Sequence, residues 1–274
     1  MAEPMPAIVL AAGGGRDKLA LAQAVADKAL LPVGGRPMID LMLDALHTAQ
    51  RVSEVVVVAD EGSPLVEHLA GREGVSVAFP SGPGFLDSMS AGMERFADRR
   101  RVLVCSGDIP LVTAEGIDDF VGRCDLYPTA DLCYSIIRAE ACNKQFPGGR
   151  RTTVKLREGE FTGGNIVALS PEFLERERAR FEQVFALRKS PLKLCALLGW
   201  GLVLKLMLRL ASVAAVVERA KSILNCEVAA IETPCAAIGF DVDKPEDLAA
   251  VEGYLGRTAS YPLGRLRRPH PPPS

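Results

Sequence analysis

Several residue patterns are missing from this 274-residue chain, and each absence excludes a class of function. The seven cysteines are scattered and form no CxxC pair, so neither a zinc site nor a disulfide framework is indicated. Reduced thiols of this kind favour a cytoplasmic protein. The three histidines fall in two expected helices and the C-terminal tail. Nucleophilic serine or cysteine chemistry, which needs a histidine nearby, is therefore without support.

An excess of positive charge is also missing. The formal net charge is −2, and residues 257–274 hold four arginines and no acid, so residues 1–256 carry 28 basic against 34 acidic groups. This balance lacks the basic footprint of a nucleic-acid-binding protein, and we expect no nucleic-acid partner. The N-terminus has no charged region before its first apolar run, and we therefore expect no signal peptide.

Apolar runs alternate with helical patterns along the chain. The runs at 7–12, 54–59, 102–105, 132–137 and 165–169 predict buried strands, and amphipathic stretches between them predict helices. This alternation predicts an α/β fold with a mixed, mainly parallel sheet flanked by helices. We expect one domain over residues 1–256, with a helical insert near 172–224. The Pro- and Arg-rich tail, 257–274, is expected to be disordered.

A glycine-rich loop follows the first predicted strand. The segment Ala7–Lys28 begins AIVLAAGGGRDK, so three glycines come directly after the apolar run. Backbone N–H groups of such a loop can surround phosphates. The spacing fits neither the P-loop pattern nor the dinucleotide fingerprint. The alternative is an ordinary tight connection between a strand and a helix.

Two acidic turns complete this pattern. Asp108 follows a buried strand, at the edge where open α/β sheets bind ligands. Asp241 and Asp243 lie two residues apart near the C-terminus, about 7 Å apart if that segment is extended. Each acidic turn could instead cap a helix or turn. Taken with the glycine loop, the acids predict metal-assisted attack on a nucleotide, with Mg²⁺ as the metal.

Together these motifs resemble a known family, the MobA-like nucleotidyltransferases of GT-A type. These include molybdenum-cofactor guanylyl- and cytidylyltransferases, sugar-phosphate nucleotidylyltransferases and methylerythritol-phosphate cytidylyltransferase. The resemblance rests on LAAGGG at 10–15, KALLPVGGRPM at 28–38, SMSAGM at 88–93, SGDIPL at 106–111 and DKPEDL at 243–248. It implies a GT-A-like fold and transfer of NMP from an NTP to a small phosphorylated or cofactor acceptor, with release of pyrophosphate.

The resemblance also implies roles for individual residues. Lys28 and Asp108 would be catalytic, and Asp108 and Asp243 would bind Mg²⁺. Asp17 stands in the position where the family usually has a basic residue. The nucleotide-binding residues would be Leu10, Ala11, Ala12, Gly13, Gly14, Gly15, Arg16, Lys18, Lys28, Ser88 and Gly107.

The acceptor side is predicted from residues 150–165. Phe161–Asn165 resembles the family's turn that meets the acceptor, which implies contacts from Gly164 and Asn165. Arg151 and Lys155 could clamp an anionic acceptor, or they could belong to a solvated hairpin.

The uncharged stretch 194–204 would span about 17 Å as a helix, too short to cross a bilayer. We favour an insert that covers the acceptor site or forms a homodimer seam over a helix that contacts a membrane surface. Two rival functions stay open, a nucleotide-binding module without catalysis and a GT-A glycosyltransferase that uses an NDP-sugar. The second rival would use Asp241–Asp243 as its D-x-D motif.

Overall fold

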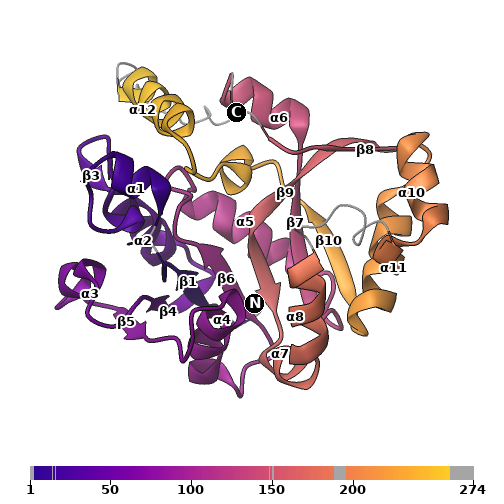
Figure 1. Ribbon diagram of the computed structural model, residues 1–274, viewed down its shortest axis with the longest axis horizontal. Coiled ribbons are helices and arrows are strands. Elements are labelled where there is room, and N and C mark those ends of the chain that lie inside the picture. The colour runs from indigo at the N-terminus through magenta and orange to yellow at the C-terminus, as the bar shows by residue number, and fades with distance from the viewer. Residues whose placement is uncertain are drawn as a thin grey trace, which may run out of the picture.

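A mixed sheet forms the centre of the molecule. The computed structural model describes residues 3–13, 15, 17–147, 149, 151–187 and 196–259. The strands of the main sheet lie in the order β10-β7-β9-β6-β1-β4-β5, with β8 paired to β9, and β2 and β3 form a separate hairpin (Figure 1). The bounds are β1 Met5–Leu10, β2 Pro32–Val33, β3 Arg36–Pro37, β4 Val52–Val58, β5 Val75–Ala78, β6 Val102–Ser106, β7 Leu132–Arg138, β8 Val154–Leu156, β9 Gly159–Leu169 and β10 Val228–Glu232.

Most neighbouring strands in this sheet run parallel. Strand β1 pairs in parallel with both β4 and β6, while β9 runs antiparallel to β6 and β7. The predicted mixed, mainly parallel sheet is therefore confirmed. Because β1 lies between β4 and β6, the loops that leave the carboxyl ends of β1 and β6 meet at the switch point of the sheet.

Helices cover both faces of the sheet. They are α1 Lys18–Ala22, α2 Met38–Thr48, α3 Pro64–Leu69, α4 Phe85–Met93, α5 Ala114–Cys124, α6 Ala139–Gln145, α7 Pro171–Arg176, α8 Arg178–Leu187, α10 Trp200–Met207, α11 Val213–Leu224 and α12 Pro245–Ala259. Short 3-10 helices η2 (Lys28–Leu30), η3 (Glu94–Phe96) and η4 (Ala236–Gly239) join them.

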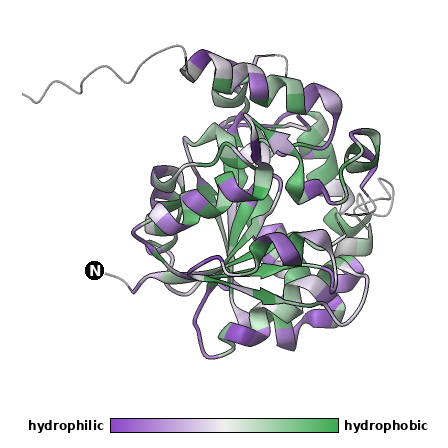
Figure 2. Ribbon diagram, turned by 90° about the vertical axis from the view of Figure 1, so that its left-hand side faces the viewer, coloured by the Kyte–Doolittle hydropathy of each residue, from purple (hydrophilic) through white to green (hydrophobic). Residues whose placement is uncertain are grey.

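Alternation along β1 shows how the two faces are filled. Ala7 and Val9 pack with α2 and α5 on one face, whereas Ile8 packs with α4 and α7 on the other. Such burial on both faces is expected of a parallel strand with continuous apolar sequence. Figure 2 shows the same arrangement, with the strands mostly hydrophobic and the hydrophilic residues gathered on the outer sides of the helices.

Strand β9 is longer than the sequence indicates. The resemblance predicts a turn at Phe161–Asn165, but this segment lies inside β9 and pairs with β7. Gly163 and Gly164 serve close packing here rather than a turn, because a Cβ on Gly164 would lie 2.2 Å from Ser135 Oγ. The prediction of a turn is wrong, since glycine in a strand also marks close approach of a neighbour.

The expected helical region after residue 171 forms several separate helices. At the start of the expected insert, residues 171–187 form two helices, α7 and α8. In the stretch 194–204, residues 194 and 195 lie outside the described part, and α10 begins at Trp200. Within the described residues, no helix combines the length and apolarity needed to span a membrane. Helix α12 extends to Ala259, so residues 257–259, expected to belong to a disordered tail, are helical. Residues 260–274 lie outside the described part of the chain.

Candidate active site

The glycine loop begins where β1 ends. Gly107 lies against this end of β1: its N–H donates to Leu10 O at 3.0 Å, and a Cβ on it would lie 3.1 Å from the same oxygen. Gly13 has a φ of +85°, in the region that favours glycine, and its N–H donates to Asp60 Oδ2 at 2.8 Å. Gly14 and Arg16, which the sequence predicts to bind nucleotide, lie outside the described residues.

Asp17, at the end of this loop, is the N-cap of helix α1. Its carboxylate caps α1, accepting from Leu19 N at 2.8 Å and Ala20 N at 3.2 Å. Lys18 is the first residue of α1, and its exposed side chain is not part of the pocket lining. The acid at the family's basic position is thereby explained, because an aspartate is among the best N-caps and a lysine cannot accept these bonds.

Lys28 connects the two acidic turns. Its Nζ lies 2.7 Å from Asp108 Oδ2 and 2.6 Å from Asp243 Oδ1, and the Lys28 side chain is 13% exposed. Asp27 holds the backbone in place, because its carboxylate accepts from Ala29 N at 2.9 Å. Burial alone would lower the pKa of Lys28, but the charges and hydrogen bonds of the two aspartates raise it above the ordinary value. The raised pKa keeps Lys28 positively charged at neutral pH.

A third carboxylate, that of Asp241, lies close to the two that pair with Lys28. Oxygens of Asp108, Asp241 and Asp243 all lie within 4.8 Å of one another. A backbone hydrogen bond from Val242 N to Asp108 O, 2.9 Å, fixes the two turns together although they are far apart in sequence. Ser106 Oγ donates to Asp108 Oδ1 at 2.5 Å and orients that carboxylate. The predicted pair, Asp108 and Asp243, thus meets, and Asp241 joins it as a third acid.

The pKa values of the two C-terminal acids are shifted in opposite directions. Burial raises the pKa of Asp241, and the nearby charges of Asp108 and Asp243 raise it further, against the opposing effect of Arg151. Burial also acts to raise the pKa of Asp243, but the hydrogen bond and charge of Lys28 outweigh it and hold the pKa below its usual value. The cluster therefore keeps one well-ionised carboxylate, Asp243, beside a more readily protonated one, Asp241.

The residues predicted to bind the acceptor lie in different places. Arg151 Nη1 pairs with Asp241 Oδ1 at 2.6 Å, and its guanidinium lies 3.8 Å from the Phe240 ring centroid. Lys155 is half-exposed and lies 3.8 Å from Glu160, while its neighbours on β8 line the pocket. Gly164 and Asn165 do line the pocket, and Asn165 Nδ2 donates to Asp241 Oδ1 at 3.4 Å. The structure thus brings Gly164 and Asn165 to the pocket, but not Arg151 or Lys155.

The donor set fits a hard divalent cation. Mg²⁺ is held in proteins by one or two carboxylates together with water and substrate phosphates, and the cluster offers carboxylate oxygens of this kind. The ammonium of Lys28 lies between Asp108 and Asp243, so it would compete with a cation for the same oxygens. Asp108 and Asp243, the predicted pair, could hold such a cation.

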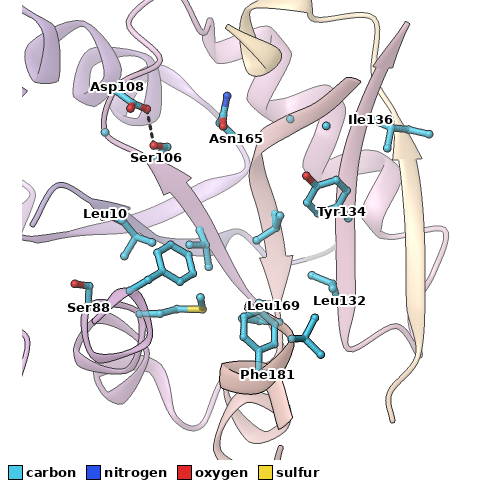
Figure 3. Close-up of a pocket in the computed structure, with 18 of the residues that line it drawn as sticks. Leu10, Ser88, Ser106, Asp108, Leu132, Tyr134, Ile136, Asn165, Leu169 and Phe181 are labelled. Atoms are coloured by element: carbon cyan, nitrogen blue, oxygen red, sulfur yellow. Dashed lines mark hydrogen bonds between the residues drawn. The ribbon is translucent and has the colours of Figure 1, made fainter. Parts of the chain in front are cut away.

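The pocket in front of these groups has a volume of about 1420 Å³. At one end lie the glycine loop, Lys28 and Asp108, with Ser88 of α4 also in the lining. Figure 3 shows Asp108, Ser106 and Asn165 at this polar end and Leu132, Leu169 and Phe181 at the other.

Two residues that line the pocket belong to none of the sequence motifs and were not predicted. Tyr134 on β7 lines the pocket, and burial raises the pKa of its hydroxyl, so it stays protonated at neutral pH. Asp60, after β4, lines the pocket beside Gly13. The alternation of β7 could have indicated Tyr134, since Leu132, Tyr134 and Ile136 share one face. For Asp60, its position after a buried strand was the available signal.

Comparisons with known proteins show the family and the fold of the chain. A model of the MobA-like NTP transferase domain matches residues 7–188. A hypothetical transferase from Thermus thermophilus superposes with a TM-score of 0.76 at 38% identity, over 90% of this chain and 100% of that chain. CMP:2-keto-3-deoxy-manno-octonic acid synthetase complexed with CTP superposes with a TM-score of 0.61 at 15% identity, over 93% and 99% of the two chains, which shows the shared fold.

Two curated relatives match over shorter regions. The 2-C-methyl-D-erythritol 4-phosphate cytidylyltransferase of Bifidobacterium longum is 30% identical over 141 residues, which cover 48% of this chain and 47% of that protein. The bifunctional protein GlmU of Stenotrophomonas maltophilia is 29% identical over 124 residues, 45% of this chain and 26% of that protein. The matches thus span half or less of the length of these relatives.

Proposed function

The chain belongs to the MobA-like NTP transferase family, and on that premise we propose that it transfers NMP from an NTP to a small acceptor and releases pyrophosphate. The observation that carries the proposal is the position of Lys28. It joins Asp108 and Asp243, and Lys28 and Asp108 line the same pocket as Gly13 of the glycine loop.

In this reaction the protein mainly has to stabilise negative charge on the phosphate oxygens, and it forms no covalent bond to the substrate. An acceptor oxygen attacks the α-phosphorus, the bond to the bridging oxygen breaks, and pyrophosphate leaves with the electron pair. Negative charge grows on the phosphate oxygens, and a fixed cation stabilises it. Lys28 supplies such a cation, since its raised pKa keeps it charged throughout the neutral range. A bound Mg²⁺ would add further charge neutralisation at Asp108 and Asp243.

The pocket also positions the reactants. The segment of α4 that contains Ser88 borders the glycine-loop side, where the nucleotide would lie. Asn165 and Tyr134 come from strands on the opposite side, where they can orient an acceptor. Holding both reactants in one pocket lowers the barrier because the encounter is already arranged.

A nucleotide screen with a turnover assay tests this function. Thermal stability is measured with ATP, GTP, CTP and UTP, each with and without Mg²⁺, because a bound ligand stabilises the fold in proportion to RT ln(1 + [L]/Kd). Pyrophosphate release is then measured for the stabilising NTP with a panel of phosphorylated and alcohol acceptors. We expect one NTP to stabilise in the presence of Mg²⁺ and to release pyrophosphate with one acceptor class.

Asp108→Asn is the matched variant for the turnover assay. It keeps the shape of the side chain but removes the charge that pairs with Lys28, and we expect pyrophosphate release to fall by about a hundredfold or more. Asp98→Asn, at an exposed position outside the pocket lining, should leave turnover unchanged. Full turnover by Asp108→Asn would refute the role of this carboxylate. Stabilisation by an NTP without any pyrophosphate release would instead favour a nucleotide-binding module.

A further inference from the structure

The pocket continues beyond the polar end into a second compartment, which we call the apolar chamber. Strands β7, β9 and β10 form its floor and helices α8 and α11 form its walls, with Leu132, Val167, Leu169, Phe181, Val217 and Ala220 among the lining residues. Among the described residues that line the pocket, the charged ones are Asp17, Lys28, Asp60 and Asp108, and these lie at the polar end.

The chamber is a space in the molecule rather than packed core. Val167, Phe181, Val217 and Ala220 adjoin the core cluster of this face, yet each keeps part of its surface accessible. Protein interiors normally close such gaps, because side chains pack to the density of organic crystals. The whole pocket, about 1420 Å³, is larger than the roughly 300–1,000 Å³ of ordinary small-molecule sites. It has room for a second ligand group beyond a nucleotide.

The chamber lies on the acceptor side of the pocket. Along β9, Asn165 reaches the polar end, and Val167 and Leu169 follow on the same face toward the chamber. On β7, Tyr134 lies between the two compartments, with Leu132 on the chamber side (Figure 3). A molecule with its reactive oxygen near Asn165 would therefore extend over aliphatic side chains, away from the glycine loop.

From this division of polarity we propose that the acceptor is amphipathic, with a phosphate or hydroxyl head at the polar end and a hydrocarbon chain in the apolar chamber. Calling this ligand the acceptor rests on the proposed nucleotidyl transfer. Its physical basis is separate, because an apolar cavity that is continuous with a polar site favours ligands that carry both kinds of group.

The acceptor could come from solution or from a lipid surface, and the outside of the protein bears on this point. Helix α10 packs beside β8, whose Val154 and Leu156 line the pocket. Several apolar side chains on α10 and just after it are 57–77% exposed; they are Trp200, Leu204, Met207, Leu208 and Leu210. Helix α10 thus places exposed apolar side chains at the β8 edge of the pocket, and apolar side chains of this kind can bind at a lipid surface.

Titration calorimetry with n-alkyl phosphates from butyl to decyl, below their micelle concentrations and with Mg²⁺ present, tests the chamber. We expect affinity to rise about fourfold for each added methylene until the chain fills the chamber. Ala220→Phe should flatten this dependence by filling the space. Ala214→Phe, on the exposed side of the same helix, should leave it unchanged. An affinity that does not change with chain length in the wild-type protein overturns the inference, whatever the variants do.

Two further measurements distinguish a membrane ligand from a soluble one, and the proposed chamber from the proposed nucleotidyl transfer. Sedimentation with phosphatidylcholine vesicles that contain a long-chain alkyl phosphate assigns the ligand to membranes if the protein co-sediments, and to soluble amphiphiles if only the calorimetry is positive. Either result supports the chamber. Chain-length dependence without pyrophosphate release from any NTP would contradict the proposed function but keep the chamber. NTP turnover with flat chain-length dependence would do the reverse.

Discussion

Removing the Lys28 ammonium should have opposite effects on folding and on cation binding. In Lys28→Ala the cluster loses a charge-assisted hydrogen bond to the largely buried Asp108, a contact that contributes about 1.5–3 kcal/mol. The pair with Asp243 counts for about 1 kcal/mol or less, because that carboxylate is 55% exposed and screened by solvent. We therefore expect the metal-free variant to be about 1.5–4 kcal/mol less stable.

Without the Lys28 ammonium, the carboxylates of the cluster repel one another and its positive charge no longer offsets the repulsion. At the 4.8 Å limit of their separation, two ionised carboxylates repel by about 3.5 kcal/mol at an effective dielectric constant of about 20. A divalent cation relieves this repulsion and no longer competes with the ammonium. Mg²⁺ should therefore bind Lys28→Ala at least about tenfold more tightly than wild type without nucleotide, since 1.4 kcal/mol corresponds to a factor of ten.

Urea unfolding in EDTA and in Mg²⁺ measures both effects. At a Mg²⁺ concentration of about 100 Kd, the variant should regain about 2.7 kcal/mol, while its pyrophosphate release stays low because the phosphates have lost a cation. Lys18→Ala removes an exposed lysine outside the pocket lining and should change neither quantity. Equal stability of Lys28→Ala and wild type in EDTA, together with equal Mg²⁺ affinity, would refute the competition between lysine and metal.

Three other predictions concern the surroundings of the site. Asp17→Ala should cost about 1 kcal/mol in urea unfolding through loss of the α1 cap, whereas Asp17→Asn should retain most of that stability; an equal loss in both would exclude capping. Gly164→Ala should destabilise by about 1–3 kcal/mol against Ser135, while Gly201→Ala, with open space around it in α10, should not destabilise; calorimetric unfolding compares them. Burial raises the pKa of Cys226 to about 12, so its thiol stays protonated at pH 8. Peptide mapping after iodoacetamide treatment at that pH should show alkylation about a thousandfold slower than in the denatured chain, and comparable rates would contradict the raised pKa.

The place of Asp108 could be predicted because it directly follows β6, and parallel strands end at one edge of the sheet. Lys28 and Asp243 could be assigned to the same site only through the family resemblance, because Lys28 lies in η2 and Asp243 lies between η4 and α12. The β-branched run of β4 and the apolar run of β1 indicate their strands, since burial on both faces leaves a continuous pattern.

The acceptor side could not be predicted in this way, because its contacts depend on tertiary partners. Arg151 looks like a free cation in sequence, but Asp241 and Phe240 lie far along the chain and occupy its guanidinium. Gly163 and Gly164 read as a turn, although they sit in β9 where Tyr134 and Ser135 leave no space for a Cβ. The apolar chamber is also invisible in sequence, since aliphatic residues on α11 look the same whether they face core or cavity.

The acid at position 17 connects the fold to the charge balance of the site. Because Asp17 caps α1 and also lines the pocket, the cap stabilises the helix but places a negative charge where the proposed NTP would bind. Among the described residues of the pocket lining, Lys28 is then the basic side chain at the polar end, and it is already paired with two carboxylates. A triphosphate brought to this site needs additional positive charge, and the cluster of Asp108, Asp241 and Asp243 is suited to recruit it as a divalent cation. The departure from the family pattern at Asp17 therefore strengthens the expectation that nucleotide binding depends on Mg²⁺.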